Sequence, residues 1–175
     1  MKIGQIVEIP ENSPIYYREK PSFKSKEEEL SWKVAQRKYS LFDGFIVGQH
    51  DGIEKFEIGQ RKGLNISGKK LPIYVIDIDM IENRIFVGQG KNHPGLFSDV
   101  LLFTEQNIEF KKNSILINDS IVKVDSSILN HSVNAKFYQF GKNYFLEFNE
   151  QIPLMIENYT IGLSYENKDV IILNK

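Results

Sequence analysis

Apolar and polar residues alternate at the start of the chain, and the alternation stops at Pro10. Alternation is typical of a strand with one buried face, and proline lacks the backbone donor that a sheet needs. We therefore predict a short strand before Pro10, followed by an irregular segment up to Phe23. The apolar positions of this strand are Ile3, Ile6, Val7 and Ile9.

One helix is predicted, from Ser25 to Tyr39. Ser25 and Glu28 have the spacing of a capping box, in which each side chain satisfies a free backbone donor at the helix start. Acidic residues follow at the positive N-terminal end and basic residues stand near the C-terminal end, as the helix dipole favours. The apolar residues form a wide surface that we expect to pack on β-structure or on a partner. They are Leu30 and Val34 on one stripe and Trp32, Ala35 and Tyr39 on another.

From Leu41 onward the pattern is that of β-structure. Short apolar runs alternate with turn signals such as Asp43-Gly44 and Asp51-Gly52, which is typical of a small barrel or sandwich. The predicted fold class is therefore mainly β, with one N-terminal helix. The predicted strands are 45–47, one beginning at Phe56 and Ile58, Ile73–Ile78, Ile81–Val87, Val100–Phe103, Ile108–Phe110, Ser114–Ile117, Ile121–Val124, Ser132–Tyr138, Tyr144–Phe148, Thr160–Tyr165 and Val170–Leu173.

The charge of the chain is nearly balanced overall but unevenly distributed. The 175 residues are 41% hydrophobic and 26% charged, with a formal net charge of −1, so the whole chain is not a strongly basic nucleic-acid binder. Lys55–Lys70 nevertheless contains five basic residues and one acidic residue, whereas Asp99–Lys175 contains seven basic and ten acidic residues. The distribution is compatible with a local basic patch near the middle of the chain.

The chain has no cysteine and only three histidines, His50, His93 and His131. This excludes disulfides, thiolate zinc sites and cysteine nucleophiles, and it argues against a multi-histidine metal site. No apolar run reaches the length of a membrane span, and the N-terminus lacks the apolar core of a signal peptide. We expect a cytoplasmic protein without a metal, a cofactor or a membrane association.

The most distinctive stretch runs from His50 to Ser98 and contains two Gly-Gln motifs, Gly59–Gly63 and Gly88–Gly90. Glycines this close together usually serve the backbone, because only glycine adopts positive φ without steric cost. The pattern allows two interpretations. The first motif is either a solvated hairpin tip or a stiff turn that holds the cationic side chains of Arg61 and Lys62 out toward a ligand.

Five motifs follow one another in this stretch. They are His50-Asp51-Gly52, Ile58-Gly59-Gln60-Arg61-Lys62-Gly63-Leu64, Tyr74-Val75-Ile76, Val87-Gly88-Gln89-Gly90, and His93-Pro94 followed by Phe97-Ser98. In order and spacing they resemble the central domain of bacterial tRNA-specific 2-thiouridylases. That family has Tyr-Val-Val, Val-Gln-Gly and Tyr-Ser where this chain has Tyr74-Val75-Ile76, Val87-Gly88-Gln89-Gly90 and Phe97-Ser98.

The resemblance implies three segments. Residues 1–40 form a leader of strand and helix that does not match the family, residues 41–97 a thiouridylase-like central β domain, and residues 98–175 a C-terminal β-barrel. In the family this barrel resembles those of translation elongation factors, and its match to this chain is weaker. The family also carries an Arg-Tyr-Arg-type segment early in the barrel, where this chain has Val124-Asp125-Ser126-Ser127. Losing these cations weakens the case for RNA binding by the barrel, because phosphate contact depends on positive charge.

The resemblance also implies what this chain lacks. Thiouridylases adenylate a uridine and deliver sulfur through two cysteines, using an N-terminal ATP-pyrophosphatase domain that precedes the matching region. This chain has no Ser-Gly-Gly-x-Asp-Ser loop and no cysteine. We therefore expect neither ATP hydrolysis nor thiolation from the chain by itself.

Independent chemistry finds little support in the sequence. Asp77 and Asp79 share one face of a predicted strand and could serve acid–base work or a metal, but solvated charges at a strand end explain them more simply. His50 beside Asp51 has the composition of an oriented base, but no nucleophile accompanies it, which favours a hydrogen-bonded turn histidine. Tyr16-Tyr17 with Arg18 could stack on bases, although such tyrosines more often cover the edge of a core.

Two hypotheses of function follow. In the first, the chain is a non-catalytic accessory module that binds tRNA or another RNA. In the second, it is a protein–protein interaction module, or a subunit that completes a separately encoded catalytic chain. The predicted RNA-binding residues are Gly59, Gln60, Arg61, Lys62, Gly63, Lys69 and Lys70. The predicted structural turn residues are His50, Asp51, Gly52, Gly88, Gln89, Gly90, His93 and Pro94.

Overall fold

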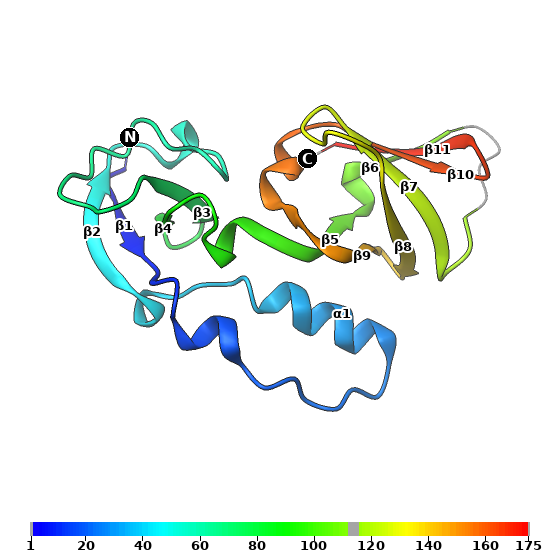
Figure 1. Cartoon of the computed structure of the whole chain (residues 1–175), viewed down its shortest axis with the longest axis horizontal. Coiled ribbons are helices and arrows are strands. Elements are labelled where there is room, and N and C mark those ends of the chain that lie inside the picture. Colours follow the sequence, from blue (N-terminus) through cyan, green and yellow to red (C-terminus); the bar gives the residue numbers. More distant parts are fainter. Residues whose placement is uncertain (1, 112–115, 175) are drawn as a thin grey trace. The chain divides into compact units, whose positions relative to one another are not determined.

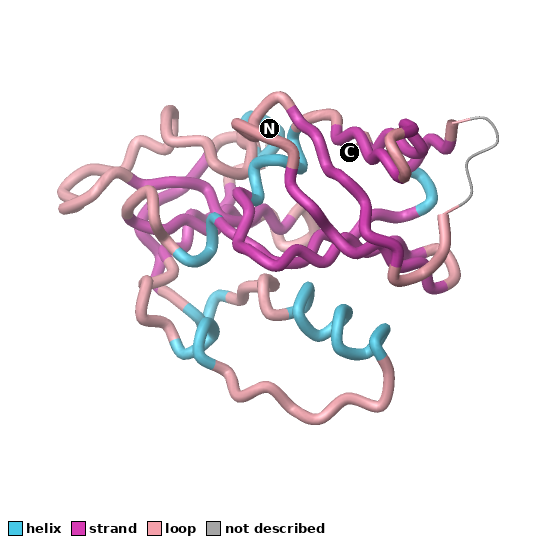
Figure 2. Tube along the Cα trace, turned by 45° about the vertical axis from the view of Figure 1, so that its right-hand side comes forward, coloured by secondary structure: helices cyan, strands magenta, loops and turns pink. Residues whose placement is uncertain are grey.

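The computed structural model describes residues 2–111 and 116–174, and it confirms a mainly β fold with one substantial helix (Figures 1 and 2). The chain divides into two compact units. Unit 1 comprises Met1–Ser22 and Ala35–Phe97, and unit 2 comprises Phe23–Val34 and Ser98–Lys175. The predicted leader, residues 1–40, is thus shared between the units, because its strand lies in unit 1 and most of its helix in unit 2.

Unit 1 is built on a four-stranded sheet with the order β2-β1-β4-β3. The central strand β1 runs parallel to β4 and antiparallel to β2. Successive residues of a strand point to opposite faces, so Ile6 and Val7 enter two different apolar clusters, one on each face. The sheet is therefore covered on both sides, and the strands are β1 (Gly4–Glu8), β2 (Phe45–His50), β3 (Ile73–Asp79) and β4 (Arg84–Gln89).

Unit 2 contains a seven-stranded sheet with the order β5-β9-β8-β7-β10-β11-β6, which curls into a half-barrel (Figure 1). Its neighbouring strands from β9 to β6 pair in antiparallel fashion. The strands predicted in this half are confirmed, except for Ser114–Ile117, which falls partly outside the described residues. Their bounds are β5 (Phe97–Thr104), β6 (Ile108–Phe110), β7 (Ser120–Ser126), β8 (Val133–Phe140), β9 (Asn143–Pro153), β10 (Ile161–Tyr165) and β11 (Lys168–Leu173).

The helix α1 (Lys26–Ala35) covers part of unit 2. Its Leu30 is fully buried in a cluster with Val100, Tyr138 and Phe145 of the sheet, as the apolar stripe predicted. The Ser25 hydroxyl accepts a hydrogen bond from the Glu28 amide at 3.1 Å, which is one half of the predicted capping box. Among the described residues no helix has the length and hydrophobicity that crossing a membrane requires.

The predicted end of the helix at Tyr39 is wrong, since α1 stops at Ala35. Tyr39 belongs to the core of unit 1, where its hydroxyl accepts a 2.9 Å hydrogen bond from Tyr16. Burial is the main reason why its pKa is raised to about 12. A residue needed in one core cannot extend a helix that packs in the other, so tertiary contacts override the local helical pattern.

Two strand predictions in unit 1 also need correction. No strand starts at Phe56 and Ile58. Phe56 lies in an irregular segment, and its side chain packs in the core of unit 1. The strand predicted over Ile81–Val87 begins only at Arg84. Ile81 is 90% exposed in the turn between β3 and β4, where the Asp79 carboxylate accepts hydrogen bonds from the amides of Ile81 and Glu82.

Candidate RNA-binding site

The predicted cationic motif lies in a long irregular segment between β2 and β3, and not at the tip of a hairpin. Two backbone hydrogen bonds fasten it to β3: the Gly59 amide donates to the Val75 carbonyl at 2.8 Å, and the Val75 amide donates to the Gln60 carbonyl at 2.9 Å. Gly59 and Gly63 have φ values of 85° and 84°, which only glycine adopts cheaply. The glycines therefore shape the turn that carries Arg61 and Lys62.

Gln60 is the internal brace of this turn. Its side-chain oxygen accepts a hydrogen bond from the Glu57 amide at 3.0 Å, and its side-chain nitrogen donates to the Lys62 carbonyl at 2.9 Å. Both ends of the amide are therefore used within the loop. The role that the geometry gives Gln60 is to hold Arg61 and Lys62 in place.

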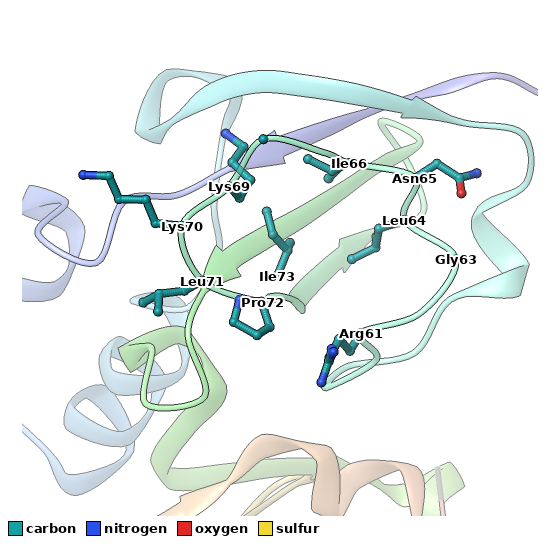
Figure 3. A pocket seen from close by; sticks show the side chains of 11 residues that line it. Arg61, Gly63, Leu64, Asn65, Ile66, Lys69, Lys70, Leu71, Pro72 and Ile73 are labelled. Atoms are coloured by element: carbon teal, nitrogen blue, oxygen red, sulfur yellow. The ribbon is translucent and has the colours of Figure 1, made fainter.

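A polar pocket of about 350 Å³ opens beside the motif (Figure 3). Arg61 and Lys70 lie on opposite sides of it, with Pro72 and Ile73 between them (Figure 3). Arg61, Lys62 and Lys70 are exposed, and the ion pairs found among residues 2–111 and 116–174 involve none of them. These three cations are available to an anionic ligand.

Lys69 has a different environment from its neighbour Lys70. Its Nζ lies 2.5 Å from Oε2 of Glu8, whose side chain is 4% exposed. The other Glu8 oxygen accepts a 2.6 Å hydrogen bond from Gln89, and the Lys69 ammonium also lies over the Phe45 ring at 5.3 Å. Lys69 thus neutralises a buried carboxylate. This contact ties the segment Gly59–Lys70, which we call the basic loop, to β1 and β4.

The turn residues around the second Gly-Gln motif are internal supports. Gln89 accepts a hydrogen bond from the Leu71 amide at 3.3 Å, in addition to binding Glu8. The Gly90 amide donates to the Pro72 carbonyl at 2.8 Å. Pro94 starts a short 3-10 turn, η4 (Pro94–Leu96), directly after the buried His93. The end of β4 therefore positions the segment that borders the pocket.

His93 is buried as a neutral ring. Its Nε2 lies 3.0 Å from the Ile9 carbonyl, and its Nδ1 accepts the Gly95 amide proton at 3.1 Å. This pattern requires the proton on Nε2, since the carbonyl can only accept. Burial is the main reason why the pKa of His93 is lowered, because a charged ring would lose its hydration there.

The lowered pKa of His93 predicts a loss of stability in acid. Below the usual histidine pKa of about 6.5 the unfolded chain takes up a proton that the folded chain does not. The free energy of unfolding should therefore fall as pH drops below about 6.5, by at most about 1.4 kcal/mol per pH unit for this group. Urea denaturation at a series of pH values measures the slope.

The matched variants for this prediction are His93→Gln and His131→Asn. His93→Gln should flatten the slope relative to the unmodified protein, whereas His131→Asn should leave it unchanged, because His131 is exposed. Equal slopes for the unmodified protein and His93→Gln would contradict the assignment of the acid sensitivity to His93.

The turn His50-Asp51-Gly52 joins β2 to the basic loop. His50 is 4% exposed, and its Nε2 lies 3.2 Å from the carbonyl of Asn83 in the β3–β4 turn. Asp51 pairs with Lys55 at 3.0 Å on the surface, and this lysine lowers the pKa of the Asp51 carboxyl. His50 and Asp51 therefore contact different groups, Asn83 and Lys55, which disfavours a His–Asp base and fits a turn histidine.

Comparison with known proteins places this geometry in context. The model of the tRNA methyl transferase PRC-barrel domain matches residues 32–89. The tRNA-specific 2-thiouridylase of Flavobacterium johnsoniae is 32% identical over 170 residues, covering 95% of this chain and 43% of the relative. That of Karelsulcia muelleri is 34% identical over 172 residues, covering 97% and 42%. This chain is similar to the C-terminal portion of the tRNA-specific 2-thiouridylases.

The resemblance inferred from the motifs is thereby confirmed. The prediction that residues 1–40 do not match the family is wrong, because the alignments with the Flavobacterium johnsoniae and Karelsulcia muelleri relatives cover 95% and 97% of this chain and so include most of that segment. A third thiouridylase, from Christiangramia forsetii, is 40% identical over 117 residues, which are 67% of this chain and 30% of the relative. The chain spans less than half the length of each of these three relatives. The matched domain includes β2, β3, β4 and the whole basic loop.

In this thiouridylase-like portion the other candidate groups have structural partners. Asp79 caps the β3–β4 turn, and the Asp77 carboxylate accepts a hydrogen bond from the Ile78 amide at 2.8 Å. Among the described residues no three His, Cys, Asp or Glu side chains are grouped as a metal site requires. Tyr16 covers the core beside Tyr39, while Tyr17 is 70% exposed.

Sequence reasoning missed two groups that shape the thiouridylase-like site. Glu8 is the buried partner of Lys69. The sequence contained a sign of it, because the alternation of β1 predicts a buried residue at position 8 and that residue is acidic. Leu71, which is 52% exposed, borders the pocket together with Pro72. No sequence pattern predicts that this leucine is exposed beside a pocket.

Proposed function

We propose that this chain is a non-catalytic accessory module that binds tRNA in the cytoplasm through the loop Gly59–Lys70. The observation that carries the proposal is the set of three unpaired, exposed cations on a braced loop, Arg61, Lys62 and Lys70. This loop lies in the part of the chain that is similar to enzymes named for their action on tRNA. The proposal assigns no turnover to the chain by itself.

The chemistry of the loop suits the phosphate backbone of RNA. Cationic side chains on a fixed turn contact phosphates, which set position and carry no base identity. The predicted residues have different environments, and we assign them different roles for this reason. Arg61, Lys62 and Lys70 would contact phosphates, Gly59, Gln60 and Gly63 would hold the turn, and Lys69 would anchor the loop through Glu8.

Unit 2 offers a poorer surface for phosphate. Val124 is fully buried, and the Asp125 carboxylate accepts a hydrogen bond from the Ser132 hydroxyl. The segment that follows the position of the family's arginines is therefore acidic and polar in this chain. We assign RNA contact to unit 1 for this reason.

Replacing Arg61 and Lys62 together by alanine tests the proposal. Each phosphate contact contributes slightly less than one unit to the slope of log affinity against log salt. The double variant should therefore bind tRNA more weakly, with a slope that is flatter by somewhat less than ~2. Titration of labelled tRNA at several salt concentrations gives both quantities.

The matched control is the double variant Lys123→Ala and Lys168→Ala. These lysines are exposed strand residues of unit 2, so the control loses the same charge without touching the loop. It should keep the affinity and slope of the unmodified protein. If both double variants bind tRNA alike, or if the unmodified protein shows no salt-dependent binding, the proposal fails.

A second candidate function is docking on a protein that supplies the catalytic chain. The observation in its favour is Phe42, which is 96% exposed on a turn that is rigidly capped by Ser40 and Asp43. Phe45 and Ile46 of β2 are also about half exposed nearby in the sequence, at 49% and 51%. Large apolar side chains exposed to solvent are a feature of many protein interfaces. This candidate predicts no salt-dependent binding of tRNA.

A further inference from the structure

A second pocket, of about 420 Å³, adjoins the first on unit 1. The two share Leu71 and Pro72, which form a ridge between them. A hydrogen bond holds each residue of the ridge in place. The Leu71 amide donates to the Gln89 side chain, and the Gly90 amide donates to the Pro72 carbonyl. We call this second cavity the ridge pocket; its remaining lining residues are Glu11, Tyr74, Gln89, Gly90, Lys91, Asn92 and His93.

The ridge pocket differs in its chemistry from the first pocket, which we call the basic pocket because Arg61 and Lys70 border it. Its walls include Tyr74, Leu71 and Pro72, and the His93 ring is neutral with both nitrogens already bonded within the protein. These groups offer apolar and aromatic surface. Exposed polar side chains, Lys91, Asn92 and Glu11, complete the lining. Such a cavity suits a flat, uncharged ring with polar edges.

We propose that the ridge pocket binds one unstacked base of a single-stranded RNA segment whose phosphates contact Arg61 and Lys70 across the ridge. The inference rests on the proposed function and adds to it the kind of RNA that the site selects. Bases that are freed from a helix bind more tightly when they stack on aromatic side chains, by roughly tenfold or more for each base. Tyr74 is the aromatic residue placed for this contact.

The distribution of charge supports this orientation. The ridge pocket has one acidic and one basic lining residue, Glu11 and Lys91, so it offers a phosphate no net positive charge. The Glu11 carboxylate can accept hydrogen bonds from the amino or imino groups of a base. The cations Arg61 and Lys70 stand in the other pocket, where Lys69 is already neutralised by Glu8. The backbone would therefore follow the basic pocket while the base enters the ridge pocket.

The test compares two short single-stranded oligoribonucleotides of equal length, one with all its bases and one with abasic residues. They carry the same phosphates, so contacts to phosphate alone give equal affinities. Stacking of one base predicts about tenfold tighter binding of the complete oligonucleotide, the equivalent of about 1.4 kcal/mol. Fluorescence anisotropy of end-labelled oligonucleotides measures both affinities at several salt concentrations.

Leu71→Ala is the diagnostic variant, and Ile81→Ala is its control. Leu71 is 52% exposed and forms the ridge, whereas Ile81 is 90% exposed in the β3–β4 turn and lines neither pocket. Leu71→Ala should lower the advantage of the complete oligonucleotide about threefold or more while leaving the salt slope unchanged. Ile81→Ala should keep both.

The outcomes separate this inference from the proposed function. Salt-dependent binding with equal affinity for both oligonucleotides overturns the base site and leaves phosphate binding intact. An advantage that survives Leu71→Ala undiminished also overturns it, since the base is then bound elsewhere. Absence of salt-dependent binding to either oligonucleotide overturns the base site, and it overturns the proposed function as well only if labelled tRNA is not bound either.

Discussion

Replacing Lys69 by alanine is expected to lower the free energy of unfolding by about 3 kcal/mol, the low end of the cost of removing one partner from a buried ion pair. Lys69 lies 2.5 Å from the Glu8 carboxylate, which is almost completely buried. Without the lysine, Glu8 keeps only the hydrogen bond from Gln89, and a buried charge with too few partners is costly. Urea denaturation followed by circular dichroism measures the change.

Lys70→Ala is the matched control for this prediction. The two lysines are adjacent, but Lys70 is exposed and lies at the pocket rather than against Glu8. Its replacement should change the free energy of unfolding by no more than about 0.5 kcal/mol. Hydrogen exchange of β1 and β4 should rise in Lys69→Ala alone. Similar stabilities of the two variants would show that the pair with Glu8 contributes little.

The two lysines also separate stability from RNA binding. Under the proposed function Lys70→Ala weakens tRNA binding and preserves the fold, because its charge is available to phosphate. Lys69→Ala would act chiefly by loosening the loop. Two neighbouring residues of the same type therefore have different roles, and the difference originates in the buried carboxylate of Glu8.

Gly88→Ala is the second change expected to have a large effect, a loss of about 2–3 kcal/mol through overpacking. A Cβ at position 88 would lie 2.5 Å from Cγ and Nδ1 of His93. The ring cannot simply move away, because its two nitrogens are bonded to the Ile9 carbonyl and the Gly95 amide. The urea midpoint should therefore drop, and the protection of the β4 amides with it.

Gly48→Ala on β2 is the control for Gly88→Ala. Its added Cβ would meet only Ile66 at 3.6 Å and Ile6 at 3.8 Å, which are ordinary van der Waals distances. We expect a change within about 0.5 kcal/mol, since the site has room and alanine also restricts the unfolded chain. A loss as large as that of Gly88→Ala would mean that any side chain in this sheet is destabilising, whatever its contacts.

The local pattern of the chain determined most of the secondary structure. Alternation identified β1, short apolar runs between turn signals identified β3 and the strands of unit 2, and the capping signal at Ser25 located the start of α1. These features depend on neighbours within a few residues, so they can be inferred from sequence alone. The motif glycines were also identified correctly as backbone positions, with positive φ at Gly59, Gly63 and Gly90.

The order of motifs pointed to the thiouridylase portion, but spacing along the chain could not say which cations were free. Arg61, Lys62, Lys69 and Lys70 look equivalent in the sequence. Only the pairing of β1 with β4 brings Glu8 beside Gln89 and within reach of Lys69. Electrostatic partners that are distant in sequence are set by topology, which the local pattern does not contain.

Long-range packing also decided where the regular elements stop and where the cavities lie. The helical pattern continues to Tyr39, yet the helix ends at Ala35 because Tyr39 is needed beside Tyr16 in the core of unit 1. The Leu71-Pro72 ridge exists because the end of β4 holds both residues through Gln89 and Gly90. Propensity acts over one or two turns of chain, whereas the position of each side chain follows from which surfaces the whole chain can bury together.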